Sequence, residues 1–229
     1  LRIQAIDALA RGLQRTSGEA AAESVLAALQ EQTPPAQQNI LVRRRVDLLL
    51  DLGNPEAAVA LGREALEKRR VNWLADLALG RALVRANQDL EEAEQRLQRV
   101  VAARPDEPEV HTGLGELAMA RDDLAGAARH LDRALELDPG DWQAMRARLE
   151  VFDKAGESEE ALALLRHFVR RDAPYDARGA LELARRLPDD SETQHEERIQ
   201  LARQALRFGG GEEAAEVLRS LAPGPAEAA

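Results

Sequence analysis

The stretch that decides the fold runs from Pro108 to Asp141 and reads PEVHTGLGELAMARDDLAGAARHLDRALELDPGD. Its apolar and small residues fall at positions 7, 8, 20, 24, 27 and 32 of a 34-residue unit, occupied by Leu114, Gly115, Ala127, Leu131, Ala134 and Pro139. Glycine and alanine at positions 8 and 20 allow two helices to cross closely, and a proline near the end stops the second helix. The unit therefore predicts a helix–turn–helix.

Four further stretches align with this unit, and together they resemble the tetratricopeptide repeat (TPR). The five repeats span residues 3–36, 39–72, 73–107, 108–141 and 142–175. The third repeat needs one extra residue in its turn, near Gln88. Gly53, Asn87 and Gly156 are expected to follow helix ends with positive φ. The resemblance implies an all-α, right-handed superhelix of about five to six helix–turn–helix repeats plus a C-terminal capping helix.

Beyond residue 175 the repeat pattern weakens, and three helices are expected. They run from Asp176 to Leu187, from about Glu192 to Phe208, and from Glu212 to Leu221, with N-caps at 189–191 and a break at 209–211. We interpret residues 176–221 as a degenerate repeat and cap, which shields the end of the solenoid. Residues 1–221 are predicted to form one TPR solenoid, and residues 222–229 a flexible tail.

The composition excludes several classes of function. A net charge of −10 does not favour nucleic acid as a partner, because phosphate contacts need clustered basic residues. The absence of cysteine excludes disulfides and thiolate chemistry. No apolar run has the length of a membrane span, so no direct insertion of this segment is expected. The preference for Arg over Lys indicates a bacterial source, and cytoplasm and periplasm both stay open.

No pattern in the sequence predicts catalysis. The four histidines lack the spacing of a metal-binding helix, and Gly209–Gly211 lacks the Lys-Ser/Thr that follows in a phosphate loop. Acidic clusters such as Asp122–Asp123 are better explained as helix caps than as cation sites. We therefore expect no catalytic residue, no metal and no cofactor, and a protein that is not an enzyme.

The resemblance implies instead that the first helix of each repeat lines a concave groove that binds a protein or peptide. The groove residues predicted from this register are Arg43, Arg44, Asp47, Leu74, Leu77, Arg81, Arg85, Thr112, Glu116, Met119, Arg146 and Glu150. The groove is expected to be basic and apolar in the second and third repeats and more acidic beyond. The carboxylate clamp of some TPR adaptors is not expected, since Asp47 stands where the clamp has Asn.

The leading hypothesis is a non-enzymatic scaffold or adaptor within a larger bacterial assembly. Two alternatives stay open. A self-associating module, giving a homo-oligomer, is suggested by an apolar stripe on helix 192–208 with Ile199, Ala202, Leu206 and Phe208. A regulatory appendage of a longer enzyme or envelope protein is suggested by a chain that begins at Leu1.

Overall fold

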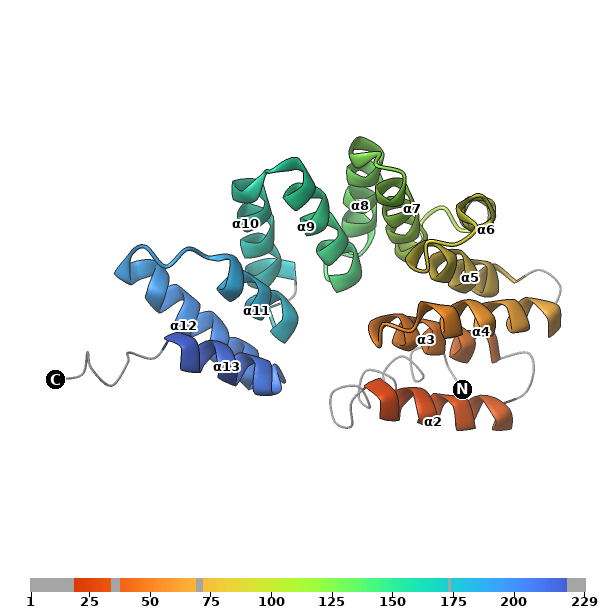
Figure 1. The fold of residues 1–229 in the computed structure, drawn as a ribbon, viewed down its shortest axis with the longest axis horizontal. Helices are drawn as coiled ribbons and strands as arrows, with labels where there is room; N and C mark the ends of the chain where they lie inside the picture. The colour runs from red at the N-terminus through yellow and green to blue at the C-terminus, as the bar shows by residue number, and fades with distance from the viewer. Residues whose placement is uncertain (1–18, 34–37, 69–71, 173, 222–229) are drawn as a thin grey trace. The chain divides into compact units, whose positions relative to one another are not determined.

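The computed structural model describes residues 19–33, 38–68, 72–172 and 174–221. It divides into two compact units, residues 1–137 and 138–229, which are described separately. In the described part of the chain every regular element is helical, which confirms the predicted all-α class. Figure 1 shows the helices in chain order. The first helix expected for the repeat at 3–36, and the expected tail at 222–229, lie outside the described residues.

The N-terminal unit consists of antiparallel helix pairs that match the predicted repeats. Its helices are α2 (Glu19–Gln32), α3 (Gln38–Asp51), α4 (Pro55–Lys68), α5 (Trp73–Arg85), α6 (Leu90–Ala103), α7 (Pro108–Ala120) and α8 (Leu124–Leu137). Each helix packs against its neighbour in the chain, and α5 also packs against α3 and α7. The first helices of successive repeats therefore lie side by side.

Small residues set the distance between the paired helices, as the sequence predicted. A Cβ added at Gly115 would lie 2.5 Å from Cγ of Leu131, and one added at Gly80 would lie 3.0 Å from Cγ of Leu97. Leu97 also fills the space next to Gly113 of the following repeat. Both leucines are fully buried, so the glycines leave the room that these side chains occupy.

Turn geometry accounts for the repeat boundaries. Gly53, Asn87 and Gly156 adopt positive φ, which confirms the prediction at all three. The turn between α5 and α6 is one residue longer than the turn between α7 and α8, and Asp89 there has φ of 42°. The extra residue expected near Gln88 is therefore accommodated by a second left-handed residue.

The C-terminal unit carries the fifth repeat and the helices that follow it. Its helices are α9 (Trp142–Ala155), α10 (Ser158–His167), a π-helical turn η2 (Phe168–Asp172), α11 (Ala177–Arg186), α12 (Glu192–Arg207) and α13 (Gly211–Leu221). The side chain of Ser191 accepts a hydrogen bond from the Gln194 amide and caps α12. The three helices expected beyond residue 175 are confirmed, whereas η2 was not predicted.

The apolar stripe expected on α12 is narrower than predicted. Ala202 is fully buried, Ile199 is partly buried, and Leu206 is exposed. Phe208 is covered in part by Tyr175, whose ring packs edge-on at 5.2 Å between centroids. Ala202 does not belong to the exposed stripe, because it lies on the face of α12 that packs against the other helices of this unit. None of the described helices combines the length and apolar character needed to cross a membrane.

Candidate functional site: the face of the first helices

The predicted groove residues lie on the first helices of the repeats, as expected. In the N-terminal unit they come from α3, α5 and α7, and in the C-terminal unit Arg146 and Glu150 come from α9. We call the set on α3, α5 and α7, together with Glu109 of α7, the inner face. Its residues are Arg43, Arg44, Asp47, Leu74, Leu77, Arg81, Arg85, Glu109, Thr112, Glu116 and Met119. The inner face is a network of ion pairs that joins three repeats.

Alternating charge at one repeat position builds the centre of this network. Asp47, Arg81 and Glu116 all occupy position 9 of consecutive repeats. Nη1 of Arg81 donates a hydrogen bond to Oδ1 of Asp47 at 2.6 Å, and Arg85 reaches Glu116 at 3.2 Å. The Arg81 side chain is only 6% exposed. Its stem lies against Gly113, where an added Cβ would be 3.0 Å from Cγ of Arg81.

A second pair crosses two repeats. Arg43 on α3 donates to Glu109 on α7, and Asp47 also lies within ion-pair distance of Arg43 and Arg44. Burial opposes ionisation of Glu109, but the hydrogen bond from Glu107 and the charges of the nearby arginines lower its pKa overall. Glu109 is thus an ionised carboxylate.

Glu107, the N-cap residue of α7, behaves in the opposite way. Burial, the hydrogen bond to Glu109 and the charge of Glu109 raise the pKa of Glu107 from 4.5 to about 8. Two neighbouring carboxyl groups that share a proton avoid the repulsion of two negative charges. At neutral pH Glu107 is therefore a neutral hydrogen-bond donor to Glu109.

This carboxyl pair gives a pH prediction. Between pH 4.5 and about 8 the unfolded chain has released the Glu107 proton and the folded chain still holds it. The contribution of Glu107 to stability is therefore complete below pH 4.5 and is lost as the pH rises through about 8. Urea unfolding from pH 5 to 9 should show a loss of stability in the wild type that is absent in Glu107→Gln. Parallel pH profiles would contradict the shared proton.

The structure corrects the prediction that the second and third repeats present a basic surface. Arg43, Arg81 and Arg85 each contact a carboxylate of the same face. Two of these carboxylates, those of Asp47 and Glu116, belong to the groove predicted from the sequence, but their pairing with the arginines was not predicted. The signal was present, because the charge at position 9 changes sign from the second repeat to the third and again from the third to the fourth.

Several uncharged groove residues are also less accessible than predicted. Leu77 and Thr112 are essentially fully buried, and Leu74 and Met119 are nearly so. They fill the contacts that α5 makes with α3 and α7. Leu77 and Thr112 therefore support the inner face instead of lining an open groove.

The residues predicted on α9 lie in a more open setting. Arg146 donates a hydrogen bond to Gln143 at 3.4 Å, and Glu150 pairs with Lys154 at 3.6 Å. The Glu150 side chain is half exposed. On the same helix, Asp153 accepts two hydrogen bonds from Arg186, at 2.6 Å and 2.7 Å.

The described residues contain no group of three or more His, Asp or Glu side chains arranged to hold a metal ion. Within the same ranges, His111 stacks against His130 with centroids 6.1 Å apart, and its Nε2 lies 2.8 Å from the Pro105 carbonyl oxygen. Both imidazoles therefore have structural contacts.

Comparison with solved structures identifies the fold. A thermophilic TPR protein (TTC0263) of Thermus thermophilus is 19% identical, with a TM-score of 0.60 over 80% of this chain and 98% of its own. A tetratricopeptide repeat protein from Parabacteroides merdae is 15% identical, with a TM-score of 0.61 over 96% and 84%. A chain of the APC/C hetero-tetramer Cut9-Hcn1 is 15% identical, with a TM-score of 0.58 over 97% of this chain and 46% of the matched chain. No curated protein matches the sequence.

The family assignment rests on the sequence profile of the tetratricopeptide repeat. The profile matches three overlapping segments, residues 43–108, 77–142 and 112–177, which together cover more than half of the chain. These segments begin within α3, contain α4 to α10 in full, and include all of the inner face. The chain belongs to the tetratricopeptide repeat family, whose members characteristically serve as protein-interaction scaffolds.

Proposed function

We propose that the chain is a non-enzymatic scaffold that binds a protein or peptide segment through the first helices of its repeats, within a larger bacterial assembly. The observation that carries this proposal is the concentration of charged side chains on the inner face. The binding module in this proposal is the whole predicted solenoid, residues 1–221.

The energetics of ion pairs favour a binding role for this face. Bringing charged side chains out of water costs free energy that their mutual attraction repays only in part, so apolar packing would hold α3, α5 and α7 together at least as well. A face that keeps at least three arginines and three carboxylates therefore offers recognition beyond what folding requires. Its alternating charges select a partner by charge register.

The paired state of the arginines defines how a partner would bind. A partner carboxylate that approaches Arg85 takes over a hydrogen bond that Glu116 accepts in the free chain. A partner ammonium or guanidinium group then compensates the released carboxylate. We infer that the partner segment carries both signs of charge, because the inner face presents carboxylates beside its arginines.

The test neutralises the two more accessible arginines of the inner face. Arg44 and Arg85 have side chains that are 21% and 27% exposed, so Arg44→Gln/Arg85→Gln keeps a hydrogen-bond donor at each site. For a partner captured from lysate of the source cell and then purified, we expect affinity to fall about tenfold, or about 1.4 kcal/mol. Isothermal titration calorimetry measures the change.

The matched control is Arg121→Gln/Arg133→Gln, which removes two arginines that pair with Glu94 and Asp106 away from the inner face. This control should bind like the wild type. Equal affinity of both double variants, with equal thermal unfolding temperatures, would remove the inner face as the binding site.

A further inference from the structure

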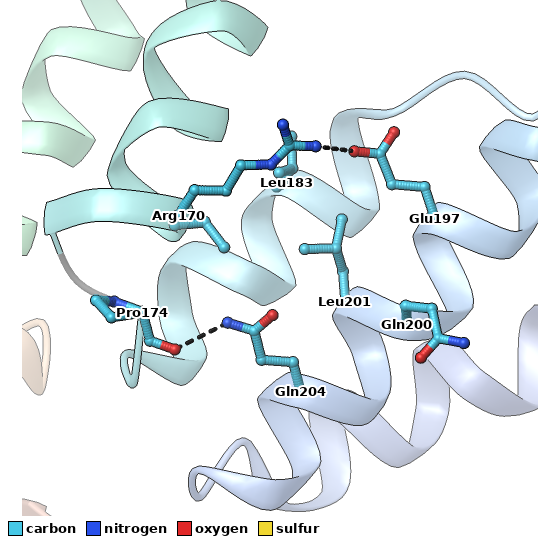
Figure 2. A pocket seen from close by; sticks show the side chains of 8 residues that line it. Arg170, Pro174, Leu183, Glu197, Gln200, Leu201 and Gln204 are labelled. Atoms are coloured by element: carbon cyan, nitrogen blue, oxygen red, sulfur yellow. Dashed lines mark hydrogen bonds and ion pairs between the residues drawn. The ribbon is translucent and has the colours of Figure 1, made fainter.

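The C-terminal unit contains a pocket away from the predicted groove. Figure 2 shows it between η2, α11 and α12, and its volume is about 300 Å³. Val169, Leu183 and Leu201 provide apolar walls, and Gln200, Gln204 and Arg170 provide polar groups. The volume suits one or two side chains of a binding partner.

The irregular end of α10 explains why this repeat has room for a pocket. The second helices α4, α6 and α8 have 14 residues each, whereas α10 has 10 and continues as the five-residue π-helical turn η2. The wider turn carries the chain away from the path of a regular second helix.

The π-helical turn is held in place from the opposite side. Phe168 is fully buried, and a Cβ added at Gly179 of α11 would lie 2.9 Å from its ring. Trp142 packs on the same ring with centroids 5.9 Å apart. Across the pocket, the Gln204 amide donates to the Pro174 carbonyl at 2.9 Å, as Figure 2 shows. The pocket is thus preformed.

Two arginines beside the pocket share one carboxylate. Arg166 and Arg170 both contact the carboxylate of Glu197, at 3.2 Å and 3.5 Å. Another carboxylate, that of Glu196, accepts a hydrogen bond from the Gln200 amide at 2.6 Å. The Arg170 side chain is 70% exposed, so it can bind a second carboxylate without leaving Glu197 unpaired.

Exposed apolar groups lie next to the pocket. Tyr175 follows Pro174 in the chain, and its exposed ring packs against Phe208, one turn beyond Gln204 on α12. Aromatic side chains that are rigid and partly exposed are typical anchors of protein interfaces.

We propose that this pocket binds an apolar side chain of an acidic protein segment, with a carboxylate of that segment on Arg170. The pocket shares no residue with the inner face. Gln200 and Gln204 lie at the mouth. Their amides donate to Glu196 and Pro174, and the second hydrogen of each NH2 group suits a hydrogen bond to the backbone of the bound segment.

The test selects peptides on the full chain from a displayed library of random 12-residue peptides. We expect enriched peptides that combine Leu, Ile or Phe with a neighbouring Asp or Glu. Synthetic versions are then measured by fluorescence anisotropy against Arg170→Glu, which reverses the rim charge, and Gln200→Trp, which fills the mouth from an exposed position. Each variant should lower affinity at least about tenfold.

Two matched controls lie on α13. Arg219→Glu reverses an arginine of similar exposure, 66%, that also pairs with a glutamate, and Glu216→Trp adds an exposed aromatic ring. Both should bind like the wild type, as should the inner-face variant Arg44→Gln/Arg85→Gln. Peptides that are lost only with the inner-face variant would support the proposed function and overturn this second site.

Two further outcomes would overturn the proposed binding of a peptide in this pocket. A selection that yields no peptide dependent on Arg170 and Gln200 overturns the proposal. Sedimentation that shows a dimer of the chain abolished by Arg170→Glu, without peptide binding, would assign the pocket to a second copy and equally overturn it.

Discussion

Arg81→Glu is expected to destabilise the N-terminal unit by about 3–5 kcal/mol, the range for breaking a buried ion pair. The Arg81 side chain is 6% exposed, and it bonds Asp47 at 2.6 Å. The substitution would place a third negative charge beside Asp47 and Glu109, whose pKa is lowered in part by Arg81. Urea unfolding followed by circular dichroism measures the loss.

The control for this prediction is an exposed pair in the same unit. Arg133 bonds Asp106 at 3.0 Å with both side chains well exposed, so Arg133→Glu should cost at most about 1 kcal/mol. Similar losses for the two variants would show that Arg81 is not held in a buried pair. The result also decides which arginines are suited to binding studies, since a variant that unfolds the unit cannot report on affinity.

The second large effect is expected at Gly115, where α7 crosses α8. A Cβ there would lie 2.5 Å from Cγ and 2.8 Å from Cδ2 of Leu131, which is fully buried and cannot move into solvent. Gly115→Val should therefore cost about 3 kcal/mol, at the upper end for overpacking a core. Thermal and urea unfolding measure the cost.

A double-mutant cycle separates crowding from loss of glycine. Leu131→Ala creates space at the contact, so Gly115→Val combined with Leu131→Ala should be less destabilised than the sum of the single changes. Ala120→Val, at the exposed end of α7, measures the cost of a valine where no side chain is crowded and should cost about 0.5 kcal/mol. Additive effects at 115 and 131 would refute the close crossing.

The sequence predicted the helices well because the repeat is a short-range pattern. Gly115 and Ala127 fix one crossing, Gly53 and Gly156 fix turns, and Ser191 caps α12, so each decision depends on residues within one unit. These features require particular side-chain sizes or backbone angles, and few residue types satisfy them.

The charge network was harder to predict because it depends on contacts between repeats. Asp47 and Arg81 are 34 residues apart, and Arg43 and Glu109 are 66 apart. The repeat position of each arginine predicted the helix that carries it and the face on which it lies. It did not predict the carboxylate in another repeat with which the arginine pairs. The alternation of sign at position 9 was the available signal.

The pocket beside η2 had no comparable signal. A π-helical turn differs from an α-helix only in that its backbone hydrogen bonds join residues five apart instead of four. The sequence from Phe168 to Asp172 contains neither glycine nor proline. Its position depends on Phe168 entering the space above Gly179, which is a tertiary contact.

Hydrogen–deuterium exchange on the complex with the captured, purified partner shows directly which helices the partner covers. We expect slower exchange in α3, α5 and α7 when the partner is bound, and a smaller effect with Arg44→Gln/Arg85→Gln at the same concentrations. Unchanged exchange in all three helices at saturating partner would contradict the claim that the first helices of the repeats form the binding surface.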